Sequence, residues 1–113
     1  MTDEIFAKIK SQLKFDAQGL IPAIIQDRKT EKVLTLCYMN DIALRTTLEK
    51  GFIHLFRRSQ NKLMKKGETS GHTQRLVEAW VDCDGDTVLL KVDQTGPACH
   101  TGAPTCFFTQ AKL

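Results

Sequence analysis

The stretch DCDGDTVLLKVDQTGPACHTGAPTC, residues 82–106, holds three of the four cysteines, three clustered carboxylates and one of the three histidines of this chain. Thiolates favour zinc, whereas carboxylates favour magnesium, calcium or manganese. A strand-like run, residues 87–92, separates the carboxylates from the last two cysteines. The two ends of the stretch therefore indicate two different metal sites.

Three cysteines of this stretch, Cys83, Cys99 and Cys106, are candidate zinc ligands. No pair of them has the short C-x2-C spacing of a zinc ribbon, so the pattern alone is a weak indication of structural zinc. Three thiolates would leave a fourth tetrahedral position open, as in a catalytic zinc site. The alternative is three small buried side chains, because free cysteine is among the most buried residue types. Cys37, inside an apolar run, is interpreted as such a core residue.

The acidic residues Asp82, Asp84 and Asp86 occupy alternate positions. In an extended chain they would point to one face, where their charges repel one another and raise each other's pKa. A divalent cation with a preference for oxygen removes this repulsion, and magnesium takes a few carboxylates together with water and phosphate. The alternative is an ordinary charged turn at the end of a strand.

The three histidines receive separate interpretations. His54 lies within a strand-like run and is interpreted as structural. His72 follows the polar, glycine-bracketed residues 66–71, and His100 adjoins Cys99. Either could move a proton to or from a metal-bound water, because histidine titrates near neutral pH. His100 could instead be a fourth zinc ligand, which would close the site.

Periodicity and turn residues predict a single, β-dominated α+β domain built from small packed sheets, a sandwich or pseudo-barrel, with two short helices. We expect one helix within the first 13 residues and one at 41–50, between Asn40 as N-cap and Gly51 as C-cap. The expected strands are 20–26, 33–38, 52–57, 75–82, 87–92 and 106–109. Pro22 places the first strand at an edge, or itself at the strand's start. In the strand at 75–82, the alternation predicts that Val77, Ala79 and Val81 share one face.

Composition limits the class of protein. The chain of 113 residues has 42% hydrophobic and 26% charged residues, as ordinary globular domains do. Neither a signal peptide nor a membrane span is predicted, so we expect a cytoplasmic protein whose thiols stay reduced. The net charge of +3 is too small to indicate nucleic acid. Residues 55–66 nevertheless carry five basic residues and no acid, which is either a solvated face or a phosphate pocket.

Several segments taken together resemble phosphoribosyl-AMP cyclohydrolase of histidine biosynthesis: residues 19–24, 38–40, 66–71, 82–86 and 96–102, with Cys106. The resemblance runs from about residue 15 to 108 and implies a monofunctional enzyme without a fused pyrophosphohydrolase domain. It further implies a compact homodimer with two metals. Zinc would be shared between subunits on Cys83, Cys99 and Cys106, and magnesium would bind Asp82, Asp84 and Asp86.

The resemblance also implies a reaction and a nucleotide substrate. Water attacks C6 of an adenine that carries phosphoribosyl on N1, and the N1–C6 bond opens to give a carboxamide. Zinc would acidify the attacking water, and His72 or His100 would move its proton. The candidate substrate contacts are Arg58, Ser59, Lys66, Glu68, Thr69 and Ser70, and magnesium would bind phosphate or ribose oxygens.

Two other classes of protein fit less well. A zinc-dependent deaminase would use similar water chemistry, but the H-x-E and P-C-x-x-C signature is missing. A zinc module that binds RNA would place aromatic residues among the lysines, yet the chain has one tryptophan and one tyrosine. We therefore expect no nucleic-acid or membrane partner.

Overall fold

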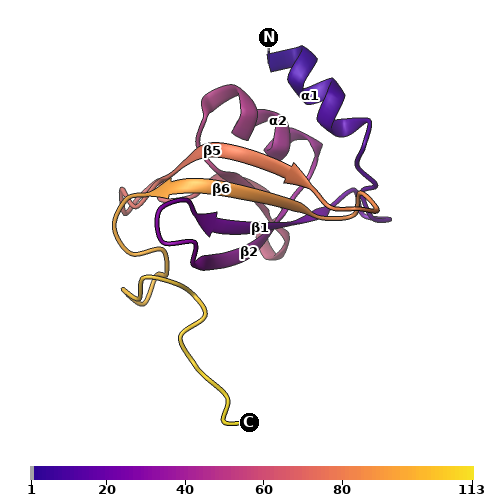
Figure 1. The fold of residues 1–113 in the computed structure, drawn as a ribbon. Helices are drawn as coiled ribbons and strands as arrows, with labels where there is room; N and C mark the ends of the chain where they lie inside the picture. The colour runs from indigo at the N-terminus through magenta and orange to yellow at the C-terminus, as the bar shows by residue number, and fades with distance from the viewer. Residues whose placement is uncertain (1) are drawn as a thin grey trace.

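The computed structural model describes residues 2–113 (Figure 1). The helices are α1 (Thr2–Lys10) and α2 (Asp41–Lys50), with a short 3-10 helix η1 (Arg58–Gln60). The strands are β1 (Ile21–Asp27), β2 (Val33–Met39), β3 (His54–Arg57), β4 (Lys62–Lys65), β5 (Gln74–Val81) and β6 (Val88–Gln94). The prediction of a β-dominated α+β domain with two short α-helices is confirmed for these residues. None of their helices has the length and apolar character that crossing a membrane requires.

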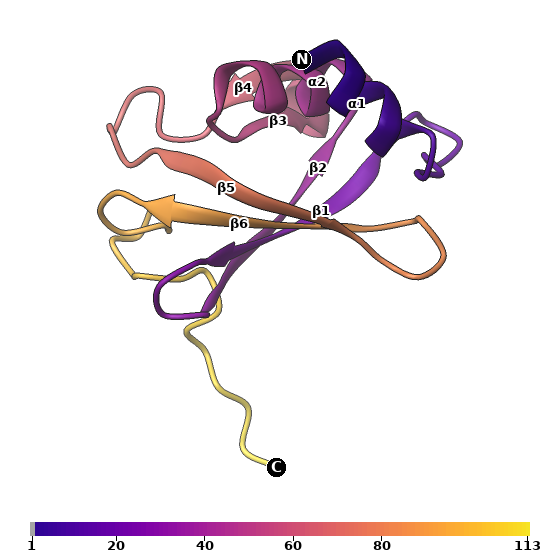
Figure 2. The same cartoon turned by 45° about the horizontal axis from the view of Figure 1, so that its top comes forward.

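The strands form a four-stranded sheet of order β2-β1-β6-β5 and a separate β3-β4 hairpin. β1 and β6 run parallel, and every other pair is antiparallel. In Figures 1 and 2 the helices and the hairpin cover one face of the large sheet, while the C-terminal segment leaves on the opposite side. Because β1 is a central strand, Pro22 marks its start, and pairing with β6 begins only at Ala23.

The core lies between the large sheet and α2. Alternate residues of β1 and β6 point inward and are buried, as the period of two for a strand requires. They are Ile21, Ala23 and Ile25 of β1 and Val88, Leu90 and Val92 of β6. Ala43 and Leu44 of α2 and Ile53 close this core from the other side.

The boundaries of α2 follow from its caps and confirm the predicted helix. The Asn40 side chain accepts a hydrogen bond from the backbone N–H of Ala43 at 2.8 Å, which satisfies a free donor of the first turn. Gly51 has φ of 80°, a left-handed conformation that glycine adopts without a steric penalty. Its N–H donates to the carbonyl of Thr47 and ends the helix.

The predicted inner face of β5 is wrong at one position. A β-bulge between Leu76 and Glu78 shifts the register, so that Leu76 pairs with the buried Val92. Leu76 therefore packs against the core, whereas Val77 is 38% exposed. Strict alternation cannot reveal a bulge, because the extra residue reverses the faces only on one side of it.

Two predictions about the smaller strands need correction. Residues 106–109 form no strand: the Cys106 N–H donates to the Leu34 carbonyl at 2.8 Å, and the chain then leaves the sheet. Strand β4, in contrast, was not predicted. Its apolar pair Leu63 and Met64 stands between lysines, so the sequence resembles a solvated basic run. It becomes a strand because it pairs with β3.

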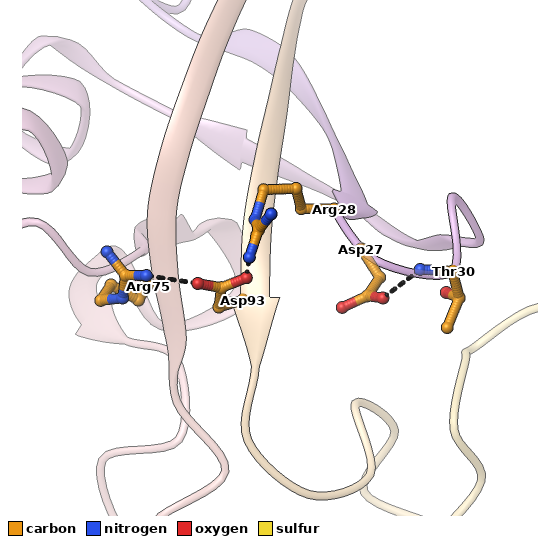
Figure 3. A network of polar contacts seen from close by, with 5 residues as sticks. All are labelled: Asp27, Arg28, Thr30, Arg75 and Asp93. Atoms are coloured by element: carbon orange, nitrogen blue, oxygen red, sulfur yellow. Dashed lines mark hydrogen bonds and ion pairs between the residues drawn. The ribbon is translucent and has the colours of Figure 1, made fainter.

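Polar contacts join β5, β6 and the β1-β2 turn at the C-terminal end of β6 (Figure 3). Asp93 accepts a hydrogen bond from Nε of Arg28 at 3.0 Å and an ion-paired contact from Arg75 of β5. Beside it, Asp27 accepts from the backbone N–H of Thr30 at 2.8 Å and fixes the β1-β2 turn. The hydrogen bond from Arg28, together with both positive charges, holds the pKa of Asp93 below its usual value.

We expect Asp93→Asn to destabilise the protein at neutral pH but not in acid. The lowered pKa of Asp93 means that its contribution to the free energy of unfolding is present above the unfolded pKa, roughly 4. That contribution disappears as the pH falls through the lower pKa of the folded state. Urea unfolding of both proteins between pH 7 and 3 measures this. Glu49→Gln, which removes an exposed carboxylate, is the control. A stability difference that persists unchanged at pH 3 would contradict this role for Asp93.

Candidate functional site

The β5-β6 turn gathers three carboxylates. Asp82, Asp84 and Asp86 each offer an oxygen, and these oxygens lie within 4.8 Å of one another. The turn is closed by backbone hydrogen bonds, and the N–H of Asp86 donates to the Asp82 carboxylate at 3.0 Å. Three exposed carboxylates at this separation form an oxygen-only donor set that fits a hard divalent cation such as magnesium.

Proximity changes the acidity of these groups. Hydrogen bonds with Asp82 and then Asp84 favour the protonated form of Asp86 and raise its pKa. The pKa of Asp82 is lowered: desolvation opposes the shift, but hydrogen bonds from Asp86 and Thr87 outweigh it. The neighbouring carboxylates thus make a second negative charge at Asp86 unfavourable, and a bound divalent ion would relieve this repulsion.

Gly85 fits the carboxylate turn tightly against the N-terminal segment. The backbone N–H of Lys14 donates to the Gly85 carbonyl at 2.7 Å. A Cβ at Gly85, where φ is 75°, would come within 2.2 Å of the Gln12 carbonyl oxygen. Both the backbone angle and the close approach require glycine here. The segment after α1 thus supports the turn that holds the three aspartates.

Cys99 and Cys106 lie together in the loop that follows β6. The Cys99 N–H donates to the Ala103 carbonyl at 3.1 Å, and Cys106 is anchored to β2 through Leu34. The Thr105 hydroxyl donates to the Val33 carbonyl at 2.6 Å and fixes the same end of the loop. These contacts hold the loop against the large sheet.

The environment of Cys99 favours its thiolate. Its Sγ accepts a hydrogen bond from Thr101 Oγ1 at 3.1 Å. This bond, a backbone contact from Thr101, the Cys106 thiol and the charge of Lys66 together lower the pKa of Cys99 against the effect of burial. Two adjacent sulfurs with a stabilised thiolate fit zinc. Burial instead raises the pKa of Cys37 to about 12, in keeping with its interpretation as a core residue.

Within one chain, Cys83 lies apart from Cys99 and Cys106. It is exposed in the β5-β6 turn, before β6, whereas Cys99 follows β6. Seven residues of β6 span about 20 Å at roughly 3.3 Å per residue. Among residues 2–113, the only triple of cysteine, histidine or acidic side chains close enough to hold one ion is the aspartate cluster.

Both candidate proton-transfer histidines line a cavity of about 250 Å³ beside Cys99. Its other lining residues are Lys66, Gly67, Ser70, Pro97, Ala98 and Gly102. Gly96 positions the His72 ring: a Cβ there would approach Cδ2 of His72 to 2.6 Å. The His72 backbone N–H donates to Ser70 Oγ at 3.1 Å. His72 is half-buried and held in place, while His100 is exposed at the rim.

The predicted substrate-binding residues fall into two groups. An adjoining hollow contains Lys66, Glu68, Thr69 and Ser70, and His100 lines both spaces. Arg58 and Ser59 line a different cavity. There the Arg58 guanidinium stacks on the Tyr38 ring, 3.9 Å from its centroid.

Arg57 was not singled out from the sequence, yet it borders both the hollow around Lys66 and the cavity of Arg58. The only sequence signal for Arg57 was its place among the five basic residues of segment 55–66. His54 is consistent with a structural role: Nδ1 lies 2.8 Å from the Phe52 carbonyl, and its backbone N–H donates to Thr47.

Comparison with known proteins gives one consistent result. Residues 35–108 match the family model described as phosphoribosyl-AMP cyclohydrolase. The chain is 55% identical over 101 residues to the phosphoribosyl-AMP cyclohydrolase of Archaeoglobus fulgidus, covering 89% of this chain and 94% of that one. It is 51% identical over 106 residues to the enzyme of that name from Paramagnetospirillum magneticum, covering 94% and 80%.

A third relative is longer. The chain is 54% identical over 97 residues to a histidine biosynthesis bifunctional protein of Caldanaerobacter subterraneus. The match covers 86% of this chain but spans only about half, 47%, of that relative's length.

Proposed function

The chain belongs to the phosphoribosyl-AMP cyclohydrolase family and is an enzyme, and from this premise we propose its reaction, metals and catalytic residues. It hydrolyses the N1–C6 bond of 1-(5-phosphoribosyl)-AMP, in histidine biosynthesis, and yields the phosphoribosyl formimino carboxamide ribotide. One observation carries the proposal: a single cavity brings together Cys99, two histidines and the side chains of Lys66 and Ser70.

The proposed metals are zinc and magnesium. Cys99 and Cys106 of one copy would hold zinc with Cys83 of a second copy, since Cys83 of the same chain lies beyond the far end of β6. When bound, zinc would make water a nucleophile near neutral pH. The enzyme is thus a homodimer whose two active sites each need both copies. The same arrangement brings the aspartate cluster of the second copy, adjacent to its Cys83, toward the cavity.

His72 and His100 are the proposed proton carriers. Opening the ring requires a base that accepts a proton from water and an acid that gives one to N1 as the N1–C6 bond breaks. Two histidines lining one cavity beside Cys99 supply both functions. The contact of the His72 ring with Gly96 fixes its orientation without a bulky neighbour.

Polar side chains around the cavity bind the rest of the substrate. Lys66 supplies a positive charge, and Ser70 and Thr69 supply hydroxyl donors, for a phosphate. Glu68 accepts hydrogen bonds from ribose hydroxyls. Arg58 and Ser59, in the neighbouring cavity, suit the second phosphate of this long substrate, with Arg57 between the two positions.

We expect Asp84→Asn to raise the magnesium concentration needed for half-maximal activity by about tenfold or more, because one of three oxygen charges is lost. The zinc content should stay at the parent value. Activity titrated with magnesium, together with metal analysis, measures both. Glu4→Gln removes the same charge from the exposed face of α1 and is the control. An unchanged magnesium response in Asp84→Asn would refute the aspartate site.

The direct test of the reaction follows the ultraviolet spectrum of purified protein with N1-phosphoribosyl-AMP. Ring opening changes the absorbance of the purine, so the proposal expects a spectral change that a chelator abolishes and that zinc with magnesium restores. No change with metal-replete protein contradicts the reaction. A change that the chelator leaves intact contradicts the role of the metals.

A further inference from the structure

An apolar row crosses the uncovered face of the large sheet. Ile24 of β1 pairs with Leu36 of β2 and with Leu89 of β6, and Leu89 pairs with Trp80 of β5. The neighbouring residues of β1 and β6 point into the core, so this row faces away from α2. Leu36 is 45% exposed and Trp80 is 56% exposed. Four apolar side chains in register on the solvent face form a contiguous patch of the kind that marks an interaction site.

One end of this row is hollowed. A cavity of about 420 Å³ lies around Trp80, and its wall is mainly apolar. We call it the Trp80 pocket; its lining residues are Ile24, Trp80, Val81, Asp82, Thr87 and Leu89. Val81 stands two positions before Cys83, so the pocket adjoins the turn that carries this candidate zinc ligand.

A matching pair of apolar side chains lies at the C-terminus. Phe107 and Phe108 directly follow Cys106 and are 63% and 57% exposed. The Phe107 N–H donates to Thr105 Oγ1 at 3.1 Å. Among residues 2–113, no backbone hydrogen bond secures the chain after Phe107. This tail extends from the face of the sheet opposite the helices, the same side as the apolar row (Figures 1 and 2).

The proposed sharing of zinc between copies places the tail of one copy near the Trp80 pocket of the other. Two thiolates on one zinc lie within about 4 Å of each other, because each Zn–S bond is about 2.3 Å. If Cys106 and the partner's Cys83 share an ion, Phe107 lies one Cα step, about 3.8 Å, from Cys106. Cys106 is then held beside the partner's Cys83, which directly follows two residues, Val81 and Asp82, that line the Trp80 pocket. This route exists only between copies, because Cys83, Cys99 and Cys106 of one chain do not come close enough together to hold one ion.

We propose that Phe107 and Phe108 of each copy insert into the Trp80 pocket of the other copy and form the apolar part of the dimer interface. This inference rests on the proposed sharing of zinc between copies and adds the surface that holds the copies together. Because a homodimer has twofold symmetry, the contact occurs twice, once in each direction. Each dimer therefore buries four phenylalanine side chains.

The first test uses Trp80, the only tryptophan of the chain, as a reporter of burial. In the zinc-loaded parent we expect its emission to shift to the blue and its quenching by acrylamide to fall as protein concentration rises through the dimer dissociation constant. F107S/F108S should raise that constant by at least about 100-fold, given the apolar area lost. Ile42→Ser, which alters a 62% exposed side chain on α2, should change neither quantity.

A mixing experiment shows whether the contact is made between chains. Trp80→Ser has an intact tail but no tryptophan, and F107S/F108S has an intact pocket but no docking tail. When zinc-loaded samples of both are mixed and allowed to exchange subunits, the remaining tryptophan should become shielded. Circular dichroism and thermal unfolding confirm that both variants are folded, as their exposed positions predict.

The outcomes separate this inference from the proposed function. Trp80 that stays open to acrylamide in an active, zinc-containing dimer, or F107S/F108S that dimerises as tightly as the parent, overturns the docking of the tail alone. A parent without zinc or cyclohydrolase activity overturns the proposed function. Shielding of Trp80 on mixing, with the expected loss of dimer affinity in F107S/F108S, supports the inference.

Discussion

Cys99→Ser abolishes turnover and releases zinc. The substitution removes the thiolate whose pKa Thr101 and Lys66 hold low, and a neutral hydroxyl replaces it poorly as a zinc ligand. Loss of a second-shell partner of a metal typically costs about 10- to 100-fold in activity, so loss of a ligand should cost more. Steady-state kinetics and metal analysis of the same preparation measure the two effects together.

Cys37→Ala is the matched control for this experiment. Its thiol packs against the core, and burial raises its pKa to about 12, so it does not take part in metal binding. It should keep the zinc content and the turnover of the parent. Full activity in a Cys99→Ser protein shown to be free of zinc would contradict the zinc assignment.

Replacing either cavity histidine produces the second large effect. His72→Ala and His100→Ala should each lower the turnover number by about 10²- to 10⁴-fold, the usual contribution of general acid-base catalysis. Zinc content should not change, because neither side chain is a proposed ligand. The pH-rate profiles distinguish the roles: removal of the base eliminates the acidic limb, and removal of the acid eliminates the basic limb.

His54→Ala serves as the control for the histidine variants, because its ring bonds the Phe52 carbonyl away from the cavity. We expect its effect on stability to exceed its effect on the pH-rate profile. If His72→Ala and His100→Ala both retain the parent profile and turnover, the two histidines are not the proton carriers.

Much of the fold follows from local sequence signals. Asn40 and Gly51 predict both ends of α2 because a cap depends only on neighbouring residues. The alternation of buried residues in β1 and β6 is equally local. The parallel pairing of β1 with β6, and the bulge between Leu76 and Glu78, depend instead on contacts far apart in the sequence. No pattern within β1, β5 or β6 encodes the parallel pairing or the bulge.

For the candidate site too, features within one turn could be predicted, whereas features built from distant segments could not. Asp82, Asp84 and Asp86 meet because one tight turn carries all three, whereas their spacing was interpreted with an extended chain. The cluster was therefore predicted correctly, but its local geometry was not. The cavity beside Cys99 could not be predicted this way, since it forms where the loop after β4 meets the loop after β6. Arg58 and Ser59 lie in another cavity because η1 turns the chain away before β4 returns it.

The central claim is that each active site combines Cys99 and Cys106 of one copy with Cys83 of the other. Cys83→Ser and Cys99→Ser should each be inactive alone. In a mixed dimer, one site contains both substitutions and the other contains none, so mixing after subunit exchange should restore activity to about a quarter of the parent value. A mixture that forms dimers yet stays inactive would contradict the shared site.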